Sequence, residues 1–173
     1  MPKKTTSNGV KLEIFTSSFK QTQKAGKLLA KEVLKNKHRQ QAFLIALVGD
    51  LGGGKTTFLQ GLAKGLGVKE KVLSPTFIIM RKFEIRNPKF ETNSKFQIPK
   101  FQTFHHIDCY RIKKPKEILD LGFKEIISDP KNIVVVEWAD RVSRIIPKGA
   151  LWLSFEFVDK NKRKIVVESK DDR

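Results

Sequence analysis

The residues from 49 to 56 read Gly-Asp-Leu-Gly-Gly-Gly-Lys-Thr and meet every fixed position of the phosphate-binding pattern G-x-x-x-x-G-K-[ST]. Backbone N–H groups of such a loop form a nest for anionic oxygens, and the helix that follows points its positive end at the same place. In this pattern Lys55 reaches the β- and γ-phosphates, and the hydroxyl of Thr56 ligates Mg²⁺. The segment therefore predicts a nucleotide site.

The segments on either side of this loop have the required character. Residues 43–48 form a short apolar run that is typical of a buried strand. After the loop, apolar residues recur at helical spacing from Phe58 to Leu66, and Gly67 is a suitable stop. The order strand, loop, helix is the context that the pattern needs.

Hydrolysis of a nucleotide also needs an acid that positions the metal and a group that orients water. Glu137 follows the most apolar segment of the chain, 133–136, and Asp108 follows 104–107. Open α/β sheets bind their ligands at the carboxyl ends of the strands, so both carboxylates are candidates for Mg²⁺ or water. The competing interpretation is that each acid only caps the element after it.

For other residues near these motifs, the sequence allows both a functional and a purely structural role. Ser74-Pro75-Thr76 is either a phosphate-sensing switch segment or an ordinary turn. Of His105 and His106, alternation along a strand lets at most one face the site, and packing or a hydrogen bond is the simpler role for each. Arg111 pairs with a phosphate or with a carboxylate, and Trp138 packs against the nucleotide, a loop or the core.

The remaining pattern predicts an α/β domain whose early part alternates strands and helices and whose later part is rich in strands. The expected sheet is mixed, mostly parallel, and extended by antiparallel strands, in a three-layer fold like that of the P-loop NTPases. Ser18 is expected to cap a helix with an apolar stripe from Ala25 to Leu34. The other expected elements are strands at 11–15, 101–107, 132–136, 151–157 and 164–168, a short helix at 115–121, and a turn at 159–162.

Composition indicates one folded domain over residues 1–173, with flexible ends at 1–10 and 169–173 and a basic hairpin insertion at 86–102. The net charge is +17, and residues 1–40 hold ten Lys and Arg against two acids. Such a surface attracts polyanions such as RNA, or acidic proteins, although a solvated lysine face explains it equally simply. A single cysteine, Cys109, and the lack of an apolar span or signal core predict a cytoplasmic protein without membrane contact.

Five motifs together resemble one known family. They are the loop with its second threonine (49–57), Ser-Pro-Thr-Phe (74–77), His-Ile-Asp-Cys-Tyr-Arg (106–111), Leu-Gly (121–122) and Val-Glu-Trp (136–138). Their order and spacing resemble those of TsaE (YjeE), the small ATPase of bacterial tRNA threonylcarbamoyladenosine (t6A) synthesis. The resemblance covers residues 12–157 and implies a Mg²⁺-dependent ATPase that works with TsaB and TsaD. In that scheme TsaD with TsaB modifies the tRNA, and the ATPase resets or sustains the complex, so its contact with tRNA is indirect.

The resemblance also implies roles for individual residues. The catalytic group consists of Glu137, Asp108 and Lys55, and the Mg²⁺ ligands are Thr56, Glu137 and Asp108. The residues expected to bind ATP are Asp50, Leu51, Gly52, Gly53, Gly54, Lys55, Thr56, Thr57, Ser74 and Thr76, with Ser18 and Thr22 near the adenine.

The chain departs from the family pattern in three ways. Cys109 stands where Leu or Val is usual, the segment 86–102 is longer and more basic, and the charge is more positive. The basic insertion has two interpretations, contact with tRNA or contact with an acidic partner surface.

Two other functions share parts of the same sequence. A small-metabolite kinase shares the phosphate loop, but 123–173 lacks an arginine-rich lid. An RNA-binding adaptor fits the charge, but no paired ribonucleoprotein motif is present. The absence of an Asn-Lys-x-Asp motif favours ATP over GTP weakly.

Overall fold

The computed structural model describes residues 11–36, 39–73, 78–86 and 101–169. In these ranges a seven-stranded sheet has the order β1-β7-β6-β2-β5-β4-β3. The strands are β1 (Lys11–Thr16), β2 (Phe43–Gly49), β3 (Met80–Glu84), β4 (Thr103–Asp108), β5 (Asn132–Glu137), β6 (Leu151–Phe157) and β7 (Arg163–Ser169). The helices are α1 (Phe19–Lys35), α2 (Lys55–Gly65), α3 (Pro115–Leu119), α4 (Phe123–Ser128) and the 3₁₀ segment η1 (Ala139–Ile145).

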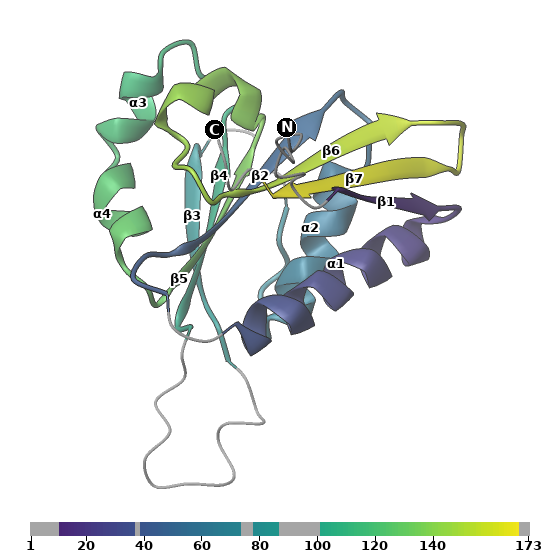
Figure 1. The fold of residues 1–173 in the computed structure, drawn as a ribbon, viewed down its shortest axis with the longest axis horizontal. Helices are drawn as coiled ribbons and strands as arrows, with labels where there is room; N and C mark the ends of the chain where they lie inside the picture. Colours follow the sequence, from purple (N-terminus) through teal and green to yellow (C-terminus); the bar gives the residue numbers. More distant parts are fainter. Residues whose placement is uncertain (1–10, 37–38, 74–77, 87–100, 170–173) are drawn as a thin grey trace, which may run out of the picture.

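The centre of the sheet is parallel and its edges are antiparallel, as the sequence predicts. Strands β6, β2, β5 and β4 run in one direction. At one edge β7 and β1 are antiparallel to their neighbours, and at the other edge β3 is antiparallel to β4. Figure 1 shows the β6–β7–β1 ribbon extending away from the rest of the sheet.

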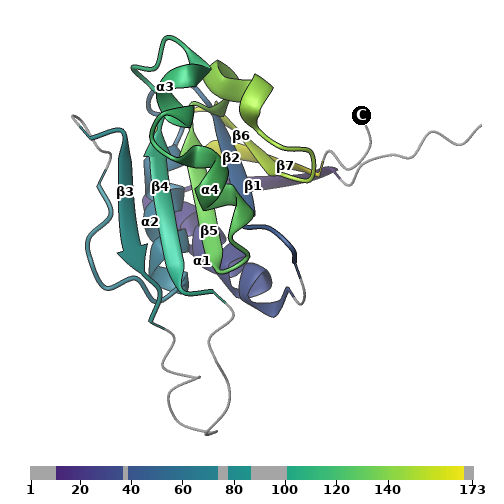
Figure 2. The ribbon, with the colours of Figure 1, turned by 90° about the vertical axis from the view of Figure 1, so that its left-hand side faces the viewer.

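Helices cover both faces of the sheet and give the three layers that the sequence predicts. Helices α1 and α2 lie on one face, and α3, α4 and η1 lie on the other (Figure 2). Strand β2 alternates between the two cores, with Ile45 and Leu47 toward α1 and α2 and Leu44 and Ala46 toward the opposite face. Every residue of β5 is buried, as is typical of a central parallel strand covered on both sides.

Most element predictions are confirmed, and three details differ. In the predicted apolar stripe of α1, Val33 is buried and Ala25, Leu29 and Leu34 pack against the core, whereas Leu28 is 52% exposed. Thr22, Gly26 and Ala30 are also buried on this side of the helix. The helix α4 and the 3₁₀ segment η1 do not appear among the sequence expectations, because each is short and lacks a long apolar period. Gly122 separates α3 from α4 in a left-handed conformation.

The parts of the chain assigned to flexible ends and to the insertion tip lie largely outside the described residues. This holds for 1–10, 87–100 and 170–173. The flanks of the insertion are described: β3 and β4 pair as adjacent antiparallel strands, and Ile85 N–H donates to the Gln102 carbonyl. Ser169, the first residue of the expected tail, pairs with Leu151 in the sheet. The division of the chain into one domain stays a prediction.

Glycines allow α1 and α2 to approach each other backbone to backbone. A Cβ on Gly61 of α2 would lie 2.0 Å from the Gln23 carbonyl oxygen, and one on Gly26 of α1 would lie 2.1 Å from the Phe58 carbonyl oxygen. Both distances are far below contact distance, so no other residue fits here without separating the helices. The two helices therefore form one closely packed unit on this face.

Replacing Gly61 with Ala should lower the free energy of unfolding by about 1–3 kcal/mol, because the methyl group overpacks the crossing. Urea unfolding followed by circular dichroism measures the change. Lys31→Ala on the exposed side of α1 is the matched control and should stay within about 0.5 kcal/mol. Equal or greater stability of Gly61→Ala, which is the usual effect of this change in an open helix, would contradict the close crossing.

Cys109 lies in the second core and is fully buried. Burial, with a smaller effect of Asp108, raises the pKa of its thiol to about 12. Because the thiolate is the reactive form, the native protein should not react with Ellman's reagent at pH 8, and it should react once after denaturation. Rapid reaction of the native protein would show that this core is open to solvent.

Candidate nucleotide and metal site

The glycine-rich loop lies between the end of β2 and the start of α2, at the carboxyl edge of the parallel strands. Gly54 is the cap residue of α2 and has φ +98°, a left-handed conformation that glycine adopts without strain. The loop is tightened by the Gly53 N–H, which donates to the Asp50 carbonyl at 3.1 Å. The positive end of α2, with no acid in its first turn, therefore opens onto this loop.

A cavity of about 420 Å³ lies over the loop and contains most of the predicted ATP-binding residues. Its lining includes Leu51, Gly52, Gly53, Gly54, Lys55, Thr56 and Thr57, together with Ser18, Thr22 and Glu137. Trp138, Phe19, Lys160, Asn161 and Arg163 complete the wall. Asp50 precedes the lining residues and contacts Lys55 through its carbonyl group, while Ser74 and Thr76 lie outside the described residues.

Lys55 is folded back onto its own loop. Its ammonium group donates to the carbonyl oxygens of Gly49 and, at 2.9 Å, Asp50, and lies 4.1 Å from the centre of the Trp138 ring. Burial lowers the pKa of Lys55, and the nearby carboxylates of Glu137 and Asp108 oppose this effect. The carbonyl and ring contacts are the kind that an anionic phosphate can replace.

Glu137 ends β5 on the face of the sheet that carries α2. Its side chain is 3% exposed, and its Oε1 lies 2.8 Å from Nε2 of His106. His106 is fully buried on β4, while His105 points to the opposite face, where burial and Lys82 lower its pKa. One histidine of the pair therefore faces the candidate site, and it holds the Glu137 carboxylate in place.

Asp108 lies beside Glu137 but is bound differently. The two residues are register partners at the ends of β4 and β5. The carboxylate of Asp108 accepts a hydrogen bond from the Tyr110 N–H at 2.9 Å, and the residue is not part of the cavity lining. The structure thus brings both predicted acids to one edge of the sheet and places only Glu137 in the cavity wall.

Trp138 has an unusual backbone conformation. Among the described residues it is the one non-glycine residue with a positive φ, at 57°. Its ring also contacts Tyr110, with 5.1 Å between ring centres, and the guanidinium of Arg141 lies 5.7 Å from the ring centre. Such a conformation costs about 1–3 kcal/mol and is concentrated at functional sites. It turns the indole toward Lys55 directly after the predicted catalytic acid.

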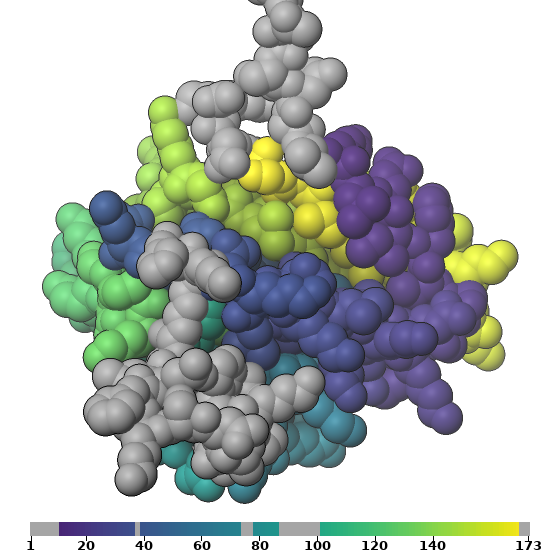
Figure 3. Space-filling model, turned by 60° about the horizontal axis from the view of Figure 1, so that its bottom comes forward, coloured from purple at the N-terminus to yellow at the C-terminus, as the bar shows by residue number. Residues whose placement is uncertain are grey.

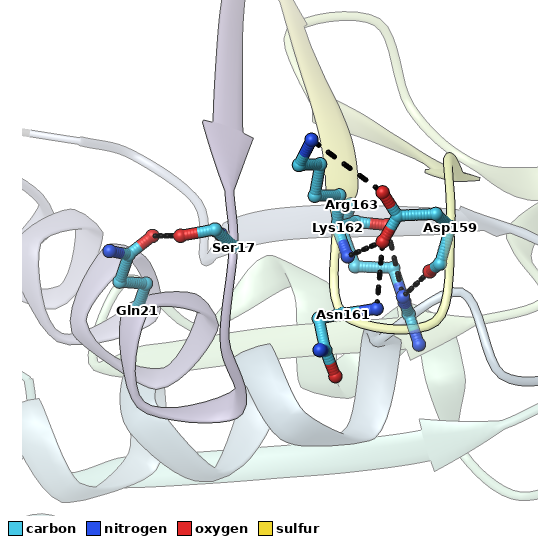
Figure 4. A network of polar contacts seen from close by, with 6 residues as sticks. All are labelled: Ser17, Gln21, Asp159, Asn161, Lys162 and Arg163. Carbon is cyan, nitrogen blue, oxygen red and sulfur yellow. Dashed lines mark hydrogen bonds and ion pairs between the residues drawn. The ribbon is translucent and has the colours of Figure 1, made fainter.

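The far wall of the cavity is built from the start of α1 and the turn between β6 and β7 (Figure 4). Ser18 caps α1 through a 3.2 Å bond from the Gln21 N–H, as predicted. In the turn, the Asp159 carboxylate accepts the N–H groups of Asn161 and Lys162, which lower its pKa. The cap at Ser18 and the hydrogen bonds to Asp159 both fix the backbone beside the cavity.

Arg163 ties this turn to the phosphate loop. Its guanidinium donates to the Gly52 carbonyl at 3.0 Å and to the Asp159 and Lys162 carbonyls at 2.8 and 2.9 Å. It also lies 4.6 Å from the ring centre of Phe157. Sequence reasoning missed this residue, since its partner Gly52 is 111 positions away and no local pattern marks the contact.

The predicted metal ligands are oxygen donors, the type that Mg²⁺ prefers. Thr56 and Glu137 both line the cavity. No cluster of three His, Cys, Asp or Glu side chains able to hold an ion occurs within the described residues. This composition fits Mg²⁺ bound with a nucleotide, because that ion takes one or two protein ligands and completes its shell with phosphate oxygens and water.

The fold and the loop define a P-loop α/β domain. The chain belongs to the TsaE family: the family described as "Threonylcarbamoyl adenosine biosynthesis protein TsaE" matches residues 16–165. A relative from Rickettsia felis, named tRNA threonylcarbamoyladenosine biosynthesis protein TsaE, is 30% identical over 87% of this chain and 75% of its own length. A protein of the same name from Haemophilus influenzae is 28% identical over 74% of this chain and 72% of its own length.

Solved structures agree with the fold. The crystal structure of YdiB from Bacillus subtilis superposes with a TM-score of 0.65 at 23% identity, over 95% of this chain and 89% of that one. In the part of the chain that the structure describes, no helix is long and apolar enough to cross a membrane.

The contact between His106 and Glu137 should be measurable as a coupling energy. His106→Ala should lower the free energy of unfolding by about 1–3 kcal/mol, since it leaves a buried carboxylate without this partner. In a double-mutant cycle with Glu137→Ala the coupling should be about 1 kcal/mol or more.

The matched control for that cycle is His105→Ala. It also removes a buried imidazole, but from the other face of the strand. Its coupling to Glu137→Ala should lie within about 0.5 kcal/mol of zero. Equal coupling for the two histidines would mean that the contact does not hold the acid specifically.

Proposed function

We propose that this protein binds ATP with Mg²⁺ and hydrolyses it to ADP and phosphate as a component of the tRNA t6A modification machinery. The observation that carries the proposal is that the glycine-rich loop and the buried carboxylate of Glu137 line the same cavity. A loop alone supports nucleotide binding, whereas the acid adds the group that hydrolysis needs. Membership in the TsaE family supports the link to tRNA modification.

In this proposal the loop and Lys55 bind the phosphates. The N–H groups of the loop and the start of α2 face the phosphate oxygens. Lys55 leaves the carbonyl groups of Gly49 and Asp50 and moves its charge onto the β- and γ-phosphates. The Thr56 hydroxyl would hold Mg²⁺, and the bound ion would supply positive charge to the phosphates.

Glu137 orients the attacking water in this proposal. Water attacks the γ-phosphorus, the bond to the β–γ bridging oxygen breaks, and that oxygen leaves with the electron pair on ADP. His106 fixes the Glu137 carboxylate so that it can hold the water and accept a proton. Asp108 is the register partner of Glu137 at the strand end, where its carboxylate would contribute negative charge for the metal.

The proposal includes partners and a compartment. We propose that the ATPase acts with TsaB and TsaD in the cytoplasm, sustaining the complex that modifies tRNA. The names of the similar Rickettsia felis and Haemophilus influenzae proteins support the link to this biosynthesis, and the two partners and the compartment belong to the proposal. ATP is the proposed nucleotide, with Ser18 and Thr22 beside its base.

ATP hydrolysis tests the proposal directly. Glu137→Gln should keep ATP binding, measured by calorimetry, and lower turnover at least 100-fold, because it removes the group that orients and deprotonates water. Lys55→Ala should weaken ATP binding itself. Turnover is measured with Mg²⁺, by the protein alone and with TsaB and TsaD present, and should rise with the partners.

Glu125→Gln is the control for these variants. It removes an exposed carboxylate from α4, on the other face of the sheet, and should keep parental turnover. Turnover by Glu137→Gln at the parental rate would refute the role of Glu137. Transfer of the γ-phosphate to a small acceptor in place of water would show that the protein is a kinase.

A further inference from the structure

A second cavity, of about 680 Å³, is lined by residues of α1, α2 and the segment after α2, and it shares no lining residue with the nucleotide cavity. We call it the lysine groove. Six lysines line it: Lys20, Lys24, Lys27, Lys64, Lys69 and Lys71. Glu70 is the one acid among its lining residues. In Figure 3 the exposed side of α1, in purple and blue, runs beside the teal-blue segment at the end of α2.

The packing of the two helices explains why these lysines gather. At the crossing of α1 and α2 the glycines Gly26 and Gly61 bring the two backbones together. Lys20, Lys24 and Lys27 follow one another on α1 at intervals of four and three residues and so share one side of the helix. Lys64 and the segment after α2 supply charges from the other wall.

The positive charge of the lysine groove is not neutralised by the fold. Elsewhere, lysines meet acids, as in the ion pairs Lys116–Asp120 and Lys164–Glu13. None of the six groove lysines forms an ion pair with an acid of the described residues, and α2 contains no acid at all. Like charges at helical spacing cost stability, so a bound polyanion would relieve this repulsion.

The remaining lining residues favour phosphate over a protein partner. Gln23 and Gln60 are joined by a 3.3 Å hydrogen bond, and Gln60 donates to the Val72 carbonyl at 3.2 Å. The apolar lining residues Ala63, Val68 and Val72 are all buried, at 2%, 7% and 3% exposure. Protein interfaces depend on exposed apolar and aromatic anchors, whereas lysines on a flexible stem bind phosphate groups as point charges.

We propose that the lysine groove binds the phosphate backbone of RNA. The family's place in tRNA threonylcarbamoyladenosine biosynthesis makes tRNA the RNA to test. The choice of tRNA rests on the proposed function, but the groove itself does not depend on ATP hydrolysis. Lys20 and Lys27 span about 10 Å along α1, and contacts of this kind recognise charge without reading base sequence.

The groove lies on the helices that also build the nucleotide cavity. Helix α1 begins at Ser18 in that cavity, and α2 begins there at Lys55. Lys64 lies nine residues after Lys55, which is about 14 Å along the axis of α2. On α2 the proposed ATP and RNA sites are therefore separated along the helix axis. On α1 they begin side by side, because Phe19 lines the nucleotide cavity and Lys20 lines the groove.

The experiment compares two triple variants with the parent protein. Lys24→Gln, Lys27→Gln and Lys64→Gln together remove three charges from the lysine groove. Lys124→Gln, Lys131→Gln and Lys148→Gln remove three exposed charges from other parts of the chain and serve as the matched control. Binding of a labelled, transcribed tRNA is measured by fluorescence anisotropy between 50 and 200 mM salt, and ATP binding by calorimetry.

The groove variant should bind tRNA at least tenfold more weakly at 100 mM salt, and its salt slope should fall by about two to three. The control variant should stay within about twofold of the parent, because its lysines lie outside the groove. Unchanged ATP binding by both variants shows that the fold and the nucleotide site are intact. If Glu137→Gln hydrolyses ATP at the parental rate while the groove variant loses tRNA binding, the proposed role of Glu137 is refuted and the assignment of the groove is not affected.

Two results would overturn the proposal. Equal weakening by both variants would mean that tRNA contacts the general charge of the protein. Unchanged tRNA binding by the groove variant would exclude RNA as the ligand. If that variant also loses binding to TsaB and TsaD, the groove is a protein interface.

Discussion

The parallel pairing of β2 with β5, and of β5 with β4, is the constraint on which the candidate site depends. It brings the loop after β2 and the acids that end β5 and β4 to one edge of the sheet, although they are far apart in sequence. Parallel pairing needs crossover connections, and the helices that provide them cover the two faces. The same arrangement therefore creates the core and collects the polar groups at its end.

At this edge of the sheet, the charged groups of the candidate site are bound by other groups of the protein itself. The ammonium of Lys55 is buried and bound by main-chain carbonyls and an indole ring, and the Glu137 carboxylate is bound by an imidazole. Buried charges without partners are costly, so these contacts keep the loop folded without a ligand. A bound phosphate must replace the contacts that Lys55 makes with the protein. The free energy of binding is therefore the difference between the new contacts with phosphate and the contacts that are lost.

The sequence predicts the parts of this structure that have strong local signals. The loop 49–56, its strand and its helix follow from residue types and period, and strand ends locate Asp108 and Glu137. The groups that hold those residues are non-local. His106 reaches Glu137 over 31 positions and Arg163 reaches Gly52 over 111, so only the folded register brings them together.

Short elements and single contacts were harder to anticipate for the same reason. The helices α4 and η1 are too short for periodicity to mark them, and tertiary packing stabilises them. The left-handed conformation at position 138 could not be predicted, because the residue is tryptophan and not the glycine or asparagine that usually adopts it. The lysines of α1 and α2 are visible in the sequence, but their collection in one groove depends on how closely the helices cross.

The pairing of β1 with β7 has a consequence for the order in which the molecule can form. During synthesis the phosphate loop emerges long before Arg163, and β1 has no strand partner until β7 has left the ribosome. The part of the cavity wall that the β6–β7 turn supplies, and the pairing that completes this edge of the sheet, are thus made after the phosphate loop. Until β7 is present, the glycine-rich loop lacks its contact with Arg163 and β1 lacks the strand with which it pairs in the described sheet.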